Sequence, residues 1–300
     1  TNLLTQGMVV AETFYRDGAD GRKVWYNPAD VDVEIDPKGR VTAARLRADG
    51  QPVAIGGIEK MAKSKNNGVD PQQMIDRFGA DTVRLFMMFT SPPEQTLEWS
   101  DEGVAGAFRF MRRLWKAVHS HVVGGAADAV DKAALTPAQR DLRRQAHATL
   151  AKVSDDIGRR RTFNTAIAAV MELMNAIAKF DDASPNGRAV VQEALEFIVL
   201  ALSPVVPHAA HVLWHELGHA GAVVDERWPA PDPEALTQDT VELVVQVNGK
   251  LRGRVTVPAG ATEDVARAAA LADPNVMKFI EGKPLRKFVY VPGKLVNVVV

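Results

Sequence analysis

Residues 60–89 read KMAKSKNNGVDPQQMIDRFGADTVRLFMMF, and this stretch decides how the chain around it is interpreted. Lys60 and Lys63 lie in a segment that also holds two asparagines and a glycine, a composition typical of a loop. Asp70 directly precedes a proline, and a glutamine follows three residues after the aspartate, which predicts a helix start of the capping-box type. A second helix is expected over residues 81–89. The stretch therefore predicts a basic loop that leads into two short helices.

The two lysines carry compact cations that could hold one polyphosphate together. When a carboxylate attacks the α-phosphate of ATP, negative charge builds on the departing pyrophosphate, and a pre-positioned ammonium group stabilises that state most. The spacing alone leaves open the alternative that both lysines belong to a solvated surface loop without a ligand. The residues that follow the loop favour the first interpretation.

The whole stretch resembles the signature loop and following helices of the class I aminoacyl-tRNA synthetases, with residues 60–64 in the place of the K-M-S-K-S loop. The resemblance implies catalytic roles for Lys60, Lys63 and Ser64. Lys63 would be the principal contact to the ATP phosphates, and Lys60 its companion. Ala62 departs from the usual serine. Because both ammonium groups are kept, we expect phosphate binding to persist and only the positioning of the loop to change.

Three features point to the leucyl-tRNA synthetases within this class. The loop continues as KNNG at residues 65–68, and residues 16–57 resemble the β-rich leucine-specific domain of bacterial members. Residues 159–175 resemble the helical anticodon-binding-type domain, and residues 244–258 and 288–300 resemble the C-terminal domain. The resemblance implies ATP-dependent activation of leucine and its transfer to tRNA(Leu). It also implies ATP with Mg²⁺ as substrate, no protein-bound metal, and a monomer.

Hydrophobic spacing predicts a helical bundle in the middle of the chain. Spacings of four, three, four and three define one apolar helix face, made of Val104, Phe108, Met111, Trp115 and Val118. Thr136-Pro137 predicts the start of the next helix. Its buried stripe is expected to consist of Leu142, Ala146, Leu150, Val153 and Ile157. Towards the C-terminal end, Asn248-Gly249 between two β-like runs predicts a hairpin.

The patterns and the resemblance together predict a multidomain, mainly α protein. Its expected parts are the end of a class I catalytic core (1–15), a leucine-specific-type β-rich insertion (16–57), the lysine loop with the following helices (58–100), a helical-bundle tRNA-binding domain (101–228), a linker (229–240) and an α+β C-terminal tRNA-binding domain (241–300).

The net charge of −1 hides strong segregation along the chain. Residues 107–180 hold 13 basic and six acidic side chains, a net charge of +7, and residues 241–300 have a net charge of +4. The segment between them, residues 181–240, has a net charge of −8, and residues 1–106 have −4. Two basic segments could therefore hold a polyanion on a nearly neutral protein, although solvated helix faces are the alternative.

Arginine side chains suit phosphates because their planar forks donate two parallel hydrogen bonds. The first group of candidates for tRNA contact is Arg159, Arg160 and Arg161, at the turn into the helix that begins near Phe163. Further arginines that could line the same phosphate-binding face are Arg109, Arg112, Arg113, Arg143 and Arg144. The second group, expected on one face of a hairpin strand by the period of two, is Lys250, Arg252 and Arg254.

The histidines form one pattern that resembles a metal site, and they lack a second pattern that is typical of class I synthetases. His215-Glu216-Leu217-Gly218-His219 matches the H-E-x-x-H pattern of zinc peptidases, but Gly218 weakens the helix and no obvious third ligand follows, so no metal site is expected. The other class I signature, H-x-G-H, is not present in the sequence. We therefore expect a fragment whose parent enzyme is catalytic, with leucine bound by a part that precedes Thr1.

The composition of the chain excludes two kinds of site and argues against a membrane protein. The chain has no cysteine, which excludes disulfides and thiolate metal sites, and no apolar run long enough to span a bilayer, so a cytoplasmic protein without a membrane partner is expected. An alternative function for the isolated chain is a non-catalytic tRNA-binding module. A zinc peptidase is the third and weakest alternative.

Overall fold

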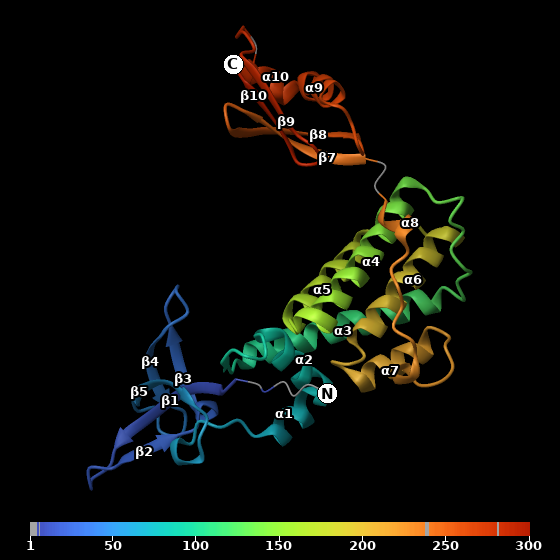
Figure 1. Ribbon diagram of the computed structural model, residues 1–300. Coiled ribbons are helices and arrows are strands. Elements are labelled where there is room, and N and C mark those ends of the chain that lie inside the picture. Colours follow the sequence, from blue (N-terminus) through green and yellow to red (C-terminus); the bar gives the residue numbers. More distant parts are fainter. Residues whose placement is uncertain (1–4, 6, 238–239, 281) are drawn as a thin grey trace. The chain divides into compact units, whose positions relative to one another are not determined.

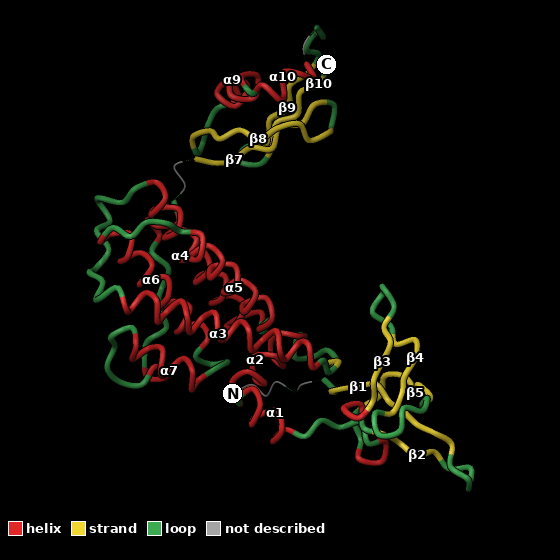
Figure 2. Tube along the Cα trace, turned by 180° about the vertical axis from the view of Figure 1, so that it is seen from behind, coloured by secondary structure: helices red, strands yellow, loops and turns green. Residues whose placement is uncertain are grey.

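The computed structural model describes residues 5, 7–237, 240–280 and 282–300. Parts of the expected core segment (1–15), linker and C-terminal domain therefore lie outside the described residues. The chain divides into two compact units, Thr1–Ala235 and Leu236–Val300, and its elements are labelled in Figure 1. Figure 2 shows strands in the N-terminal part of the first unit and in the second unit, and along the sequence the helices of the first unit separate these two regions. This architecture confirms the mainly α, multidomain fold class.

A small β region begins the first unit. Its elements are β1 (Val9–Asp17), β2 (Lys23–Tyr26), β3 (Val31–Ile35), β4 (Val41–Leu46), β5 (Ala54–Lys60) and β6 (Leu97–Glu98), with a 3₁₀ turn η1 (Pro28–Asp30). One sheet has the order β2-β1-β5, and β6 pairs in parallel with β1; β3 and β4 form a separate antiparallel pair. Phe14, Val31, Ala44, Leu46 and Val53 form its buried core. This sheet carries the lysine loop, which directly follows β5.

Two short helices connect the loop to the bundle. They are α1 (Pro71–Phe78) and α2 (Ala80–Thr90), in agreement with the predicted pair. Asp70 caps α1, but its side chain accepts the backbone N–H of Gln72 at 3.0 Å rather than that of Gln73. The predicted helix start at Asp70 is confirmed, but this contact to the second helical residue is not the predicted capping box, which needs the third. A carboxylate of Asp81 accepts the backbone N–H of Ala209 at 2.7 Å, which fixes α2 to the bundle.

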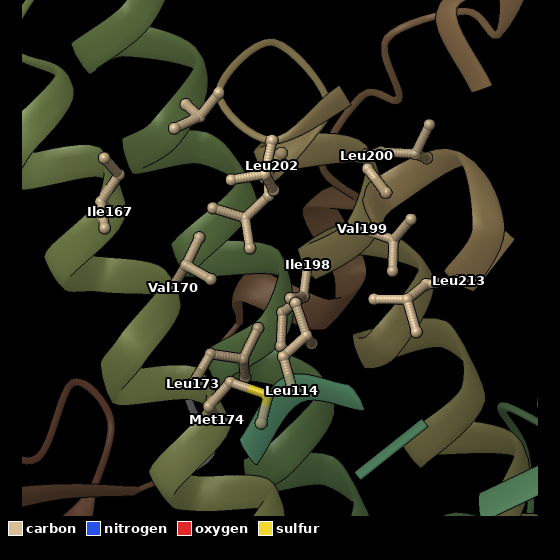
Figure 3. Packing of buried hydrophobic residues seen from close by; sticks show 14 of the residues in the cluster. Leu114, Ile167, Val170, Leu173, Met174, Ile198, Val199, Leu200, Leu202 and Leu213 are labelled. Carbon is tan, nitrogen blue, oxygen red and sulfur yellow. The ribbon is translucent and has the colours of Figure 1, made fainter. Parts of the chain in front are cut away.

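The bundle and the elements that follow it complete the first unit. They are α3 (Asp101–Val123), α4 (Pro137–Asp155), the π-helical turn η3 (Asp156–Arg160), α5 (Phe163–Lys179), α6 (Pro185–Leu202), α7 (Pro207–Glu216) and the 3₁₀ turn η4 (Val223–Asp225). The short helix α8 (Pro233–Leu236) lies at the boundary between the two units. Thr136 and Gln139 form a full capping box at the start of α4. Figure 3 shows the apolar core that α3, α5, α6 and α7 share, with Leu114, Leu173 and Ile198 among its members.

The predicted apolar face of α3 is partly wrong. Val104 and Val118 are buried as expected, but Trp115 is 46% exposed. The buried stripe runs instead through Ala107, Phe110 and Leu114, with Met111 half-buried beside it. At 3.6 residues per turn, position 114 lies over the core and position 115 is rotated away from it. The error arose because spacings of three and four fit position 115 as well as its buried neighbour, position 114. The stripe of α4 is confirmed from Leu142 to Val153.

The second unit is a four-stranded sheet with two helices. Its elements are β7 (Thr240–Val247), β8 (Lys250–Pro258), α9 (Glu263–Ala272), α10 (Pro274–Ile280), β9 (Lys287–Val291) and β10 (Leu295–Val299), with the strand order β8-β7-β10-β9. The hairpin predicted at Asn248-Gly249 is confirmed, and both residues have the positive φ that its turn requires. Among the described residues, no helix of either unit is long and apolar enough to cross a membrane.

Candidate functional site

The lysine loop begins where β5 ends. Lys60 is the last residue of β5 and pairs with Val10 of β1, so the sheet fixes its backbone. Lys63 begins a single 3₁₀ turn, η2 (Lys63–Lys65), which closes with Asn66 in the left-handed region at φ 48°. Ala62 stands at the N-cap of this turn with extended backbone and no side-chain cap. The two predicted phosphate contacts therefore lie on either side of one short bend.

Asn67 closes the base of this loop, a role that sequence reasoning missed. Its side chain is fully buried, at 0% exposed. Its Oδ1 accepts the backbone N–H of Ala62 at 2.8 Å, and its Nδ2 donates to the carbonyl oxygens of Glu59 and Lys60, each at 3.3 Å, with a longer contact of 3.4 Å to Ala11. A buried amide with all of these partners fixes both ends of the bend. Its sequence signal was the NN pair, which indicated only a loop.

The third lysine of the loop is paired with a carboxylate of the preceding strand at the half-buried edge of the loop. Lys65 forms an ion pair with Glu59, and its ammonium group lies 5.3 Å from the ring centre of Trp25. Lys60 and Lys63 are exposed, and within the described part of the chain neither ammonium group has a recorded ion pair or hydrogen bond. Ser64 is exposed as well. The loop thus presents two unpaired ammonium groups, an arrangement suited to an anionic ligand.

The arginine turn at residues 159–161 is less basic than its sequence suggests. Arg159 forms a two-pronged pair with Asp155 at 2.5 and 2.7 Å, and Arg160 reaches Asp156 at 2.8 Å. The hydrogen bond from Arg159 is the main cause that lowers the pKa of Asp155. Arg161 has the left-handed conformation, at φ 58°, and its guanidinium group has no recorded partner in the part of the chain that the structure describes. The tRNA contacts assigned to this turn stay a prediction.

Asp156 accepts the hydrogen bonds that hold the arginine turn in place. Its carboxylate is buried and accepts hydrogen bonds from Lys152 at 2.6 Å and Thr165 at 2.7 Å in addition to Arg160. Burial alone would raise the pKa of Asp156, yet the hydrogen bonds from Lys152 and Thr165 hold it below its usual value. The charge of this carboxylate therefore stabilises the turn at neutral pH.

One arginine expected on a phosphate-binding face is buried. Arg143 is only 4% exposed, and its guanidinium group pairs with Glu193 at 2.9 Å and with Asp232 at 2.9 Å. Burial would raise the pKa of Glu193, but hydrogen bonds from His147 and Arg143 lower it. The expectation for Arg143 is wrong because a polar network inside the bundle holds it. Arg109 and Arg112 are exposed, as expected.

The basic residues of the second unit do not share one face. The β7–β8 ladder contains a β-bulge, because Gln246 pairs with Leu251 whereas the preceding Val245 pairs with Gly253. This shift interrupts the alternation of side chains between the two faces of β8 that was assumed from the sequence. The guanidinium of Arg252 lies 3.8 Å from the ring centre of Phe279 on α10, whereas Arg254 pairs with Glu242 of the neighbouring strand at 2.8 Å. Lys250 is exposed at the hairpin turn. Their role in tRNA contact stays a prediction.

The H-E-x-x-H segment is built into the end of the bundle. His219 stacks on Trp214 at 3.7 Å between ring centres, and its Nε2 lies 2.8 Å from a carboxylate oxygen of Glu196. The ring of His215 instead meets His211 edge to face at 4.6 Å. In the described ranges, no group of three or more histidine, aspartate or glutamate side chains is placed to hold a metal ion. The two histidines of the motif therefore have separate structural neighbours.

Comparisons with known proteins agree with the loop and the bundle. Residues 10–100 match the family of tRNA synthetases class I (I, L, M and V), and residues 139–267 match the anticodon-binding domain of tRNA ligases. Leucine–tRNA ligases of Chromohalobacter salexigens, Alkalilimnicola ehrlichii and Pseudomonas aeruginosa are 64%, 61% and 59% identical over 99% of this chain. The chain spans about a third of the length of these relatives, 34–35%.

A solved structure extends the likeness to the fold. A LeuRS of Agrobacterium radiobacter K84, crystallised in a ternary complex with tRNA and LeuAMS, superposes with a TM-score of 0.70 at 27% identity. The match covers 80% of this chain and 31% of that one. Sequence identity over the whole chain, two family matches and the shared fold agree with one another. This chain belongs to the leucine–tRNA ligase family of class I tRNA synthetases.

Proposed function

We propose that this chain is the part of a leucine–tRNA ligase that holds the ATP phosphates and binds tRNA. The parent reaction is the ATP-dependent activation of leucine and its transfer to tRNA(Leu). The observation that carries the proposal is the pair of exposed, unpaired ammonium groups of Lys60 and Lys63, on a loop whose base is closed by the buried amide of Asn67.

The loop fits the charge that develops during activation. Pyrophosphate leaves as the leucine carboxylate bonds to the α-phosphate, so negative charge grows on the departing oxygens. Lys63, on the 3₁₀ turn, would hold these oxygens, and Lys60 would stabilise them from the end of β5. Because Asn67 fixes the bend in advance, little reorganisation is needed when the charge appears. Ser64 adds a hydroxyl group beside the two cations.

The partners follow from the same proposal. ATP arrives with its Mg²⁺ as a substrate complex, and leucine is bound by a part of the ligase outside this chain. The bundle and the second unit contact tRNA(Leu) through Arg159–Arg161 and through Lys250, Arg252 and Arg254. The ligase acts as a monomer in the cytoplasm, where tRNA is charged.

The proposal is tested by two measurements run side by side. Leucine-dependent ATP–pyrophosphate exchange and binding of tRNA(Leu) are measured for the full-length ligase and for this 300-residue chain, with an unrelated tRNA as control. We expect both activities in the full-length ligase, and salt-dependent tRNA binding without exchange in the chain alone. If the full-length ligase shows no leucine-dependent exchange, the proposal is wrong.

A non-catalytic tRNA-binding module is the second candidate for the chain by itself. The two unpaired lysines can bind an RNA phosphate as readily as ATP, which favours this candidate when the rest of the ligase is missing. Competition separates the two roles. If ATP bound by the chain is not displaced by tRNA, the loop retains its nucleotide role; if ATP does not bind measurably, the chain alone is a tRNA module.

A further inference from the structure

The outer face of α3 carries a tryptophan among cations. Arg112, Trp115, Lys116 and His119 follow one another at spacings of three, one and three, so they lie on adjacent turns of one helix face. All four are exposed, and Trp115 keeps 46% of its surface accessible. This face is rotated away from the core stripe that contains Leu114. A large aromatic ring therefore stands at the surface with basic neighbours on both sides.

The cations of this face lack internal partners. No acidic residue occurs in residues 103–127, and the structure records no ion pair or side-chain hydrogen bond for Arg112 or Lys116 among the residues it describes. Arg159 and Arg160 differ in this respect, because each is held by an aspartate four residues earlier. The unpaired charge on α3 is consequently available to an external anion without breaking any contact of the protein.

An exposed aromatic ring between cations fits RNA better than it fits a protein partner. Unpaired bases stack on aromatic side chains whatever their sequence, and neighbouring basic side chains hold the flanking phosphates. A protein interface core is instead depleted of charge. We propose that the outer face of α3 binds tRNA, with Trp115 stacking on an unpaired base and Arg112 and Lys116 holding adjacent phosphates. This inference rests on the proposed tRNA-binding function and assigns it a surface.

Two sets of variants test the face in the full-length ligase. Trp115→Ala removes the stacking platform, and Trp115→Phe keeps an aromatic ring. Arg112→Gln combined with Lys116→Gln removes two charges. The control for general helix effects is Val123→Ala, because Val123 is 72% exposed on the same helix. The control for net charge is Arg40→Gln, whose guanidinium lies in the β3–β4 turn with only a 3.9 Å contact to Asp36.

The readouts are the tRNA dissociation constant over a salt series and leucine-dependent pyrophosphate exchange without tRNA. We expect Trp115→Ala to weaken tRNA binding about tenfold and Trp115→Phe to stay within about threefold of the wild type. The double charge variant should lower the salt slope by roughly 1.5. All variants should keep the exchange activity, because α3 carries none of the residues assigned to ATP.

Each other outcome points to a distinct failure. Unchanged affinity and unchanged salt slope in both variants would overturn the proposed face while leaving tRNA binding by the ligase intact. If the wild-type ligase itself does not bind tRNA(Leu), the proposed function fails instead. In a third outcome, Trp115→Ala loses pyrophosphate exchange and Trp115→Phe does not restore the affinity for tRNA. This result would show that another part of the longer ligase covers Trp115, and the proposed face would be wrong.

Discussion

The lysine loop and the arginine turn look alike in sequence and differ in structure. Each places three basic residues within six positions, at Lys60, Lys63 and Lys65 and at Arg159–Arg161. In the loop, one of the three cations is paired, by Glu59. In the turn, two of the three are paired, by Asp155 and Asp156. The number of basic residues in a segment therefore overstates the charge that a ligand can use.

The positions of the acidic partners explain the difference. The two aspartates lie four residues before their arginines, so any helical conformation of the turn brings each pair together. Glu59 instead precedes Lys60 on the strand, and only the bend of η2 brings it to Lys65. The first pairing could be read from spacing, whereas the second needed the fold.

The largest effect is expected from the unpaired lysine of the loop. Lys63→Ala in the full-length ligase should lower leucine-dependent pyrophosphate exchange by about 10²–10³-fold, the usual consequence of removing one preorganised donor to developing charge. Lys65→Ala is the matched control, because its cation already serves Glu59, and it should cost less than about tenfold. Equal losses in both variants would mean that pairing in the structure does not decide which lysine serves ATP.

The buried amide of Asn67 should rank next. Asn67→Ala leaves the backbone N–H of Ala62 and the carbonyl oxygens of Glu59 and Lys60 without their partner, which should cost about 1–3 kcal/mol of local stability. We expect the KM for ATP to rise about tenfold or more, with a small change in global unfolding. The control is Asn66→Gly, which removes the amide of an exposed neighbour and suits the left-handed backbone of that position. A KM unchanged by Asn67→Ala would disprove the role of the amide in closing the loop.

The arginine turn should show a pH dependence set by Asp156. Because its folded pKa is lowered, this carboxylate stabilises the turn above its unfolded pKa of about 3.9, and the contribution is lost as pH falls through the folded value. Asp156→Asn should lower the free energy of unfolding by about 1–3 kcal/mol at pH 7. Denaturation curves from pH 7 to pH 2.5 should converge for the two proteins at the acidic end. A constant difference over this range would contradict the assignment.

Within the turn itself, the unpaired arginine should matter more to RNA than the paired ones. Arg161→Ala is expected to weaken tRNA binding several-fold and to reduce the salt slope by the amount that about one phosphate contact contributes. Arg159→Ala should change the affinity and the slope less. A filter-binding salt series on the full-length ligase measures both quantities. If Arg159→Ala has the larger effect, Asp155 must release its arginine on binding, and the static pairing is a poor guide to the bound state.

Local patterns were sufficient to predict much of the fold. The start of α1, the extent of α2, the start of α4 and the hairpin at Asn248-Gly249 followed from caps, periodicity and turn chemistry, because each depends on residues close in sequence. Trp115 was misplaced because periodicity of three and four tolerates a neighbouring position on either side. Arg252 was misplaced because the period of two was applied across β8 without allowing for the bulge, which falls beside Gly253.

The candidate site was predicted only in part. Its lysines followed from a family resemblance, and their exposure is a property of the fold. Asn67 could not be recognised, since its four partners belong to β1, to β5 and to the loop itself, and only the assembled sheet brings them to one amide. The burial of Arg143 likewise depends on Asp232, which lies 89 residues away. Contacts of this kind set which charges remain available, and spacing does not contain them.

The smallest expected effect concerns the residue between the two lysines. Ala62 occupies the N-cap of η2, where a serine hydroxyl could accept the backbone N–H of Ser64. A cap is worth about 0.5–2 kcal/mol in a regular helix, and a single 3₁₀ turn should gain the lower part of that range. Ala62→Ser should therefore lower the KM for ATP about twofold, and Ala62→Gly should raise it. A higher KM for Ala62→Ser would mean that the half-buried methyl group, rather than a cap, positions Lys63.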